Sequence, residues 1–111
     1  MMVKIAVIGV FHLSGQGVLM VGTVLGGTLK AGMQCHIKEY VIVARSMEAD
    51  HKLLSEAREG QTVGMAIVKL SGPEDPPKSF FHFFSKGRYV DIMKMQKGRV
   101  LEFEEPEKKQ D

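Results

Sequence analysis

The chain has 111 residues, of which 44% are hydrophobic and 25% charged; this is typical of one globular domain and argues against a disordered protein. Its one cysteine, Cys35, excludes an internal disulfide, and its apolar runs fall well short of the about 20 residues of a membrane span. Residues 1–101 hold 13 basic and eight acidic side chains, a net of +5, before an acidic end. We expect a cytoplasmic domain with no signal peptide.

The chain begins with a predicted strand over residues 3–13. Val3, Ile5 and Val7 alternate with other residues at the period of a half-buried strand. Gly9 within this stretch suggests a β-bulge or a close approach of another backbone.

Glycine-rich turns divide the next twenty residues. Residues 14–17 are Ser-Gly-Gln-Gly, which is turn chemistry, and residues 18–25 form a second strand. Gly26-Gly27 predicts the next turn, 28–29 a short strand and 31–32 a further turn.

The middle of the chain is rich in β-forming residues. We expect strands over 33–40 and 41–49 and a turn at 50–52. Residues 53–60 can be read as one helical turn that stops at a glycine. Thr62 to Leu70 is again a strand, rich in Val and Ile.

A proline-rich stretch interrupts the β pattern. Residues 71–78 hold three of the four prolines and predict an exposed loop. Beyond it, a helix over 80–85 capped by Ser79 and a strand through the phenylalanine-rich run Phe80–Phe84 both fit, and residues 88–95 are ambiguous.

Three motifs in chain order resemble the second domain of translational GTPases, the β-barrel beside the GTPase domain in elongation factor Tu and initiation factor two. Residues 11–33 are similar to Phe-x-Ile-x-Gly-Arg-Gly-x-Val-x-x-Gly-x-Val followed by Leu-Lys-x-Gly-Asp. Residues 52–64 are similar to Lys-x-Leu-x-Glu-Ala-x-x-Gly-Asp-x-Val-Gly, which in that family is an extended segment and a tight turn. Residues 96–101 resemble the closing motif Lys-x-Gly-Asp-Val-Leu.

The resemblance implies an all-β fold: a small, closed, six- or seven-stranded antiparallel barrel over residues 1–103, as a stand-alone small protein, with 104–111 a disordered acidic tail. It allows one short helix after residue 78, and the last strand, over 99–103, closes the barrel. Because side chains must fill a small barrel, we predict these core residues: Phe11, Leu13, Val24, Leu29, Ile37, Val63, Ala66 and Val68.

Catalytic signatures do not emerge from the sequence. The spacing of Gly15 and Gly17 fails the dinucleotide fingerprint, because Met20 takes the third glycine position. A P-loop reading fails because the lysine is missing, and the four histidines are scattered without the spacing of a closed zinc site. We expect no enzyme, no cofactor, no metal and no GTP.

The best candidate for function is a basic, aromatic stretch over residues 78–99. Cations bind phosphate oxygens, and aromatic faces, here the Phe80–Phe84 run and Tyr89, can stack on bases. The alternative is that the phenylalanines are core and the cations a solvated face. The candidate RNA-binding residues are Lys86, Arg88, Lys94, Lys97 and Arg99, with a second basic edge of Arg45, Lys52 and Arg58.

In the factors, this barrel helps to hold the acceptor end of aminoacyl-tRNA or contacts ribosomal RNA. Elongation factor Tu commonly carries acidic residues just before the phenylalanine, where this chain has Ile8-Gly9-Val10, and Gln16 replaces the usual basic residue of the turn. These departures argue against specific recognition of the aminoacyl end. We expect a non-enzymatic, translation-related module that contacts RNA or the ribosome; the alternative is a protein–protein adaptor using a barrel edge or the phenylalanine-rich segment.

Overall fold

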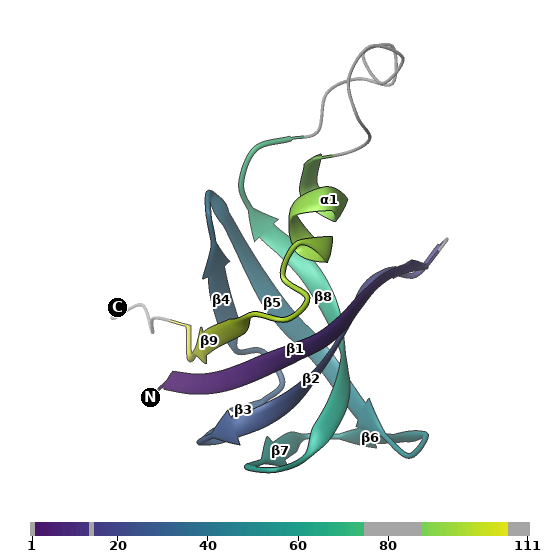
Figure 1. Cartoon of the computed structure of the whole chain (residues 1–111), viewed down its shortest axis with the longest axis vertical. Coiled ribbons are helices and arrows are strands. Elements are labelled where there is room, and N and C mark those ends of the chain that lie inside the picture. Colours follow the sequence, from purple (N-terminus) through teal and green to yellow (C-terminus); the bar gives the residue numbers. More distant parts are fainter. Residues whose placement is uncertain (1, 14, 75–87, 107–111) are drawn as a thin grey trace, which may run out of the picture.

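The computed structural model of the chain describes residues 2–13, 15–74 and 88–106. Within these ranges the chain forms nine strands and one helix (Figure 1). In chain order they are β1 (Met2–Leu13), β2 (Gly17–Gly26), β3 (Thr28–Lys30), β4 (Gln34–Ile37), β5 (Tyr40–Ala49), β6 (Lys52–Leu54), β7 (Glu56–Arg58), β8 (Thr62–Ser71), α1 (Arg88–Lys94) and β9 (Val100–Glu104).

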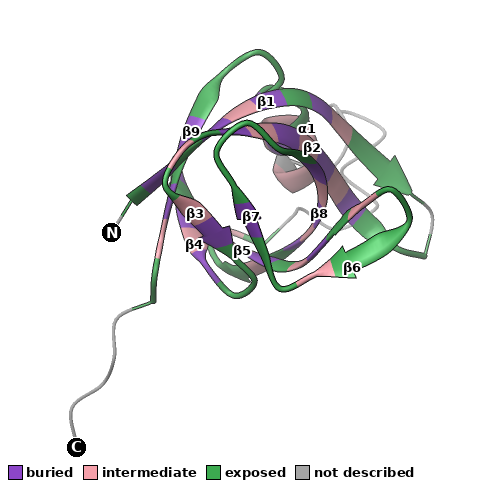
Figure 2. Cartoon of the chain, turned by 90° about the horizontal axis from the view of Figure 1, so that it is seen from below, coloured by how far each residue is buried: buried purple, intermediate pink, exposed green. Residues whose placement is uncertain are grey.

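Six of these strands form a closed antiparallel barrel. Their order is β4-β9-β1-β2-β8-β5, and pairing of β4 with β5 closes the ring. β6 pairs with the last residues of β5 and is not part of the ring. β3 and β7 form a separate two-stranded ribbon. The ribbon lies near one end of the barrel and α1 lies near the other (Figures 1 and 2). The predicted all-β class and closed antiparallel barrel are confirmed.

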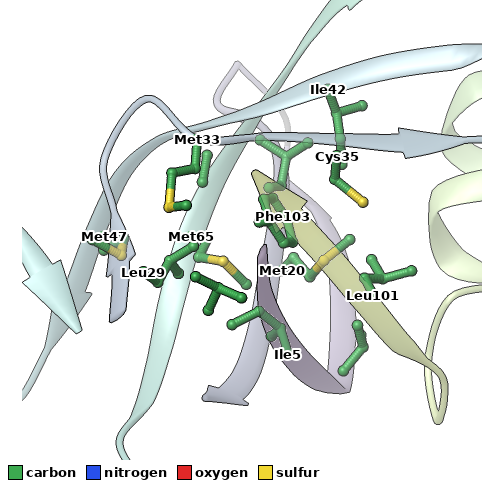
Figure 3. Close-up of a cluster of buried hydrophobic side chains, with 14 of the residues drawn as sticks. Ile5, Met20, Leu29, Met33, Cys35, Ile42, Met47, Met65, Leu101 and Phe103 are labelled. Atoms are coloured by element: carbon green, nitrogen blue, oxygen red, sulfur yellow. The ribbon is translucent and has the colours of Figure 1, made fainter. Parts of the chain in front are cut away.

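The barrel interior is filled by side chains from every barrel strand. Ile5, Met20, Ile42, Met65 and Phe103 are fully buried and gather in one cluster (Figure 3). Five of the seven methionines that the structure describes are buried, and their flexible thioethers suit a small interior of irregular shape. Leu29 of β3 and Ala57 of β7 pair with each other and are fully buried, so the ribbon belongs to the same core.

A β-bulge in β1 overturns two predicted core positions. Val7 pairs with Gly22 and Gly9 with Val21, so Ile8 is an extra residue on the bulged strand. Because side chains alternate along a strand, the bulge turns Phe11 and Leu13 to the outside, where they are 50% and 39% exposed. The expectation that both lie in the core was wrong, although Gly9 does lie at a bulge.

The alternation of buried and outward-facing side chains in β8 overturns two more predicted core positions. Val63, Met65 and Ile67 are buried, and the intervening side chains therefore face outward. Ala66 is half-buried and Val68 is 36% exposed, so neither is a core residue as predicted. The remaining predicted core residues, Val24, Leu29, Ile37 and Val63, are buried.

Local structure elsewhere decides between the alternatives that the sequence left open. Residues 53–60 are extended and end in a turn at Gly60, as the resemblance implied, rather than in a helical turn. The turn predicted at Gly26-Gly27 falls on Gly27, since Gly26 is still part of β2. Residues 88–94 are helical, whereas residues 79–87, with the Phe80–Phe84 run, lie outside the described residues.

Gly22 allows β1 and β2 to approach closely. A Cβ built on Gly22 would lie 2.5 Å from Ile5 Cγ2 and 3.0 Å from the Ala6 carbonyl oxygen. Both Gly22 and Ile5 are buried, and the backbone oxygen cannot move away without disturbing the strand pair. The barrel therefore has no room for a methyl group at this position.

We predict that Gly22→Ala lowers the free energy of unfolding by about 1–3 kcal/mol, the usual cost of overpacking a core. Gly64→Ala is the matched control, because a Cβ there meets its nearest atom, Leu19 Cδ1, at an ordinary 3.7 Å; it should change stability by less than about 0.5 kcal/mol. Urea unfolding followed by circular dichroism measures both. Equal effects of the two substitutions would contradict the close approach at Gly22.

Candidate interaction surfaces

The segment from the last residue of α1 to the start of β9, residues 94–99, is tied to the barrel by its backbone. Gln96 is buried and its Nε2 donates a hydrogen bond to the Ile92 carbonyl at 2.8 Å. The Gly98 N–H donates to the Val7 carbonyl at 2.8 Å, and the Val7 N–H donates to the Arg99 carbonyl at 2.8 Å. With Met93 fully buried in the core, this part of the chain is held by the core at one end and by β1 at the other.

Three of the predicted RNA-binding residues lie on this segment, which we name the basic segment: Lys94, Lys97 and Arg99. All three side chains are exposed. None of them forms an ion pair with a residue that the structure describes. Arg88 begins α1, but its side chain and the whole of Lys86 lie outside the described residues. The structure therefore brings together three of the five residues of this group.

Tyr89 is committed to packing. Its ring lies 5.4 Å from the ring of buried Tyr40, tilted by 58°. The Lys69 Nζ lies 5.8 Å from the Tyr40 ring and 5.6 Å from the Tyr89 ring, within cation–π range of both. It also donates a hydrogen bond to the Pro73 carbonyl at 3.2 Å. Tyr89 thus joins α1 to β5 and β8 and is not placed as a platform for a nucleic-acid base.

The second predicted basic edge lies elsewhere on the molecule. Arg45 lies at a bulge in β5, while Lys52 and Arg58 belong to β6 and β7, near the end of the barrel opposite α1 (Figure 1). All three side chains are exposed. The guanidinium of Arg58 lies 3.7 Å from the carboxylate of Glu56. The six predicted cations whose side chains the structure describes therefore lie in two groups and not on one continuous surface.

An apolar hollow that was not predicted from the sequence lies beside the basic segment. It has a volume of about 220 Å³ and is lined by Ile8, Gly9, Val10, Phe11, Val21 and Lys97. Ile8 is 52% and Phe11 50% exposed, so two large apolar side chains meet solvent there. The signal in the sequence was Gly9: once its bulge is included, the alternation of β1 turns Phe11 outward.

A second hollow, of about 410 Å³, is polar and is lined by Gln34, His36, Val41, Glu104 and Glu105. His36 Nε2 lies 3.6 Å from Glu104 Oε1, and both side chains are exposed. Exposed pairs of this kind contribute little to stability. In the described part of the chain, no cluster of three or more His, Cys, Asp or Glu side chains could hold a metal ion, and no helix has the length and apolarity that crossing a membrane requires.

The barrel architecture resembles part of known proteins. No protein-family model matches the chain. It matches translation elongation factor SelB from Methanococcus maripaludis with a TM-score of 0.64 and 21% identity over 92% of its own length. The chain has the domain II-like β-barrel of translation factors. It is also 34% identical over 73 residues to elongation factor 1-alpha from Plasmodium falciparum.

These matches concern one part of much longer proteins. The match to elongation factor 1-alpha covers 64% of this chain and 16% of that protein, and the match to SelB covers 18% of the SelB chain. What the chain shares with these proteins is the barrel, and it spans less than a fifth of their length.

Cys35 is a core residue whose thiol is buried. It is 1% exposed, and burial, aided by the nearby Glu104 and Glu102 carboxylates and opposed by a backbone hydrogen bond at Glu102, raises the pKa of its thiol to about 12 from an ordinary 9.0. Because the folded chain keeps this proton longer than the unfolded chain, the thiol contributes stability that is present below pH 9 and lost as the pH rises toward 12.

We predict that this thiol alone lowers the free energy of unfolding by about 2 kcal/mol between pH 8 and pH 10.5. Cys35→Ala is the control, because it removes the titrating group and leaves all others. Urea unfolding at the two pH values should show a steeper loss for the unmodified chain than for the variant. Parallel losses would contradict the raised pKa.

Proposed function

We propose that this chain is a non-enzymatic binding module of the translation machinery, working in the cytoplasm and contacting RNA or the ribosome through the basic segment. Two kinds of observation support the proposal: a barrel shared with translation elongation factors and exposed cations held on a fixed backbone. The observation that carries it is the pair of hydrogen bonds between Val7 and residues 98–99, which hold the basic segment against the barrel.

Phosphate recognition needs cations that are both available and positioned. Lys94, Lys97 and Arg99 are available, since they have no ion-pair partner among the described residues. They are positioned, since Met93 just before them and Gln96 between Lys94 and Lys97 are both buried. Lysine and arginine side chains on such a segment neutralise backbone phosphates without reading sequence.

A protein–protein adaptor is the second candidate, and the apolar hollow favours it. Phe11 and Ile8 are half exposed on one face of the barrel beside Lys97. Apolar surface of this kind next to a charged rim is typical of a contact with another protein.

The two sets of predicted cations provide a matched test. We predict that Lys94→Ala, Lys97→Ala and Arg99→Ala together weaken binding to single-stranded ribosomal RNA and flatten the slope of log K against log salt by about 2, at about 0.7 per lost phosphate contact. The control is Arg45→Ala, Lys52→Ala and Arg58→Ala, which removes the same charge from the second predicted basic edge and should leave the slope nearly unchanged. Fluorescence anisotropy at several salt concentrations measures both.

Equal weakening by the two triple variants would show attraction to the overall positive charge and no specific surface. An unmodified chain that does not bind RNA at low salt would refute the RNA contact and leave the adaptor.

A further inference from the structure

We propose that the free edge of β1 around Val10 and His12 binds an extended acidic peptide by strand addition. This inference concerns backbone hydrogen bonds and does not depend on the RNA contact proposed above. It rests on a strand edge that no described residue pairs with, an apolar hollow beside that edge and the charge that surrounds both.

The outer edge of β1 is paired along half of its length. β9 pairs with Met2–Ala6, and residues 98–99 bond to Val7. Beyond Val7, β2 is the partner of β1 within the described part of the chain. Figure 1 shows the far end of β1 running past the barrel.

Backbone geometry assigns the free groups to Val10 and His12. The Leu13 carbonyl accepts a hydrogen bond from the Gln16 N–H across the hairpin turn, so Leu13 directs its backbone groups toward β2. Successive residues of a strand direct theirs to opposite sides. Val10 and His12 therefore direct two N–H and two carbonyl groups away from β2, and no described residue bonds to them.

The side chains beside this edge offer a surface for a bound strand. Phe11 lies over Gly9, because a Cβ on Gly9 would be 3.1 Å from Phe11 Cε2. Phe11 and Ile8 border the hollow of about 220 Å³ that Lys97 also lines. Natural proteins protect exposed edges with lysine or proline, and residues 8–13 contain neither.

The positive charge beside the edge favours an acidic peptide as the occupant. Lys97 lines the hollow, and Lys94 and Arg99 belong to the same segment. A second copy of this chain would bring its own Lys97 and a body with a net charge of +5 over residues 1–101 to the same place. A peptide that alternates acidic and apolar residues offers carboxylates to these cations and apolar side chains to the hollow, which Lys97 also lines.

The experiment titrates the full-length ¹⁵N-labelled chain with a capped peptide of sequence Asp-Val-Asp-Val-Asp-Val. We expect binding to slow amide exchange at Val10 and His12. Two further peptides carry N-methyl groups on every Val or on every Asp. Since a strand directs alternate N–H groups to each side, one of them should keep its affinity and the other should lose about tenfold or more.

Two variants complete the test. Val10→Pro removes an edge N–H that is free among the described residues and should abolish peptide binding. Should that variant fail to fold, Lys97→Glu decides, because it should reverse the preference from the Asp peptide to one with Lys in its place.

Equal affinity of both N-methylated peptides, or unchanged exchange at Val10 and His12, would overturn the proposal. So would protection of these amides in the free chain that rises with its concentration, which would identify a second copy as the occupant. If the chain binds the peptide but does not bind RNA, this inference is supported and the RNA contact is refuted.

Discussion

The ring closes because β9, which follows the helix near the end of the described chain, inserts between β1 and β4. Its two buried side chains, Leu101 and Phe103, enter the core, so closure and core formation are one event. The same insertion fixes the chain just before β9: once β9 is paired with β1, residues 98 and 99 lie against Val7. The position of the basic segment is thus a consequence of barrel closure.

Two bulges decide what the outside of the barrel presents. One places Ile8 and Phe11 on the surface of β1, and the other leaves Arg45 exposed on β5. A bulge shifts the alternation by one residue, so the same strand fills the core with one half and offers apolar groups to solvent with the other. In β1 that second half is also the half without a second neighbour in the described chain. An apolar surface and open backbone groups therefore coincide, beside a cation.

Much of the fold could be predicted from the sequence, because turns and strands depend mainly on residues close together in the chain. The glycines at 15, 17 and 32 lie in left-handed conformations at turns, where their lack of a Cβ matters. Phe11 and Val68 were misplaced because core membership depends on the phase of the alternation, which a single inserted residue or the pairing partner sets. The helix over 88–94 was ambiguous because its apolar face is defined by long-range contact with Tyr40 and Lys69.

For the candidate surfaces, the sequence identified the residue types but not their grouping. Eight cations were chosen from local composition, and the fold separates Arg45, Lys52 and Arg58 from Lys94, Lys97 and Arg99. Only the hydrogen bonds between Val7 and residues 98–99 make Lys94, Lys97 and Arg99 a fixed surface. The hollow at Phe11 could not be predicted while Phe11 was taken for a core residue.

The central claim is that barrel closure positions the basic segment to contact RNA. Mapping amide chemical shifts of the ¹⁵N-labelled chain during titration with tRNA at low salt tests it most directly. The account predicts shifts concentrated on residues 94–99 and the neighbouring part of β1, with little change at residues 45, 52 and 58. Shifts concentrated on β5, β6 and β7, or none at all, would contradict it.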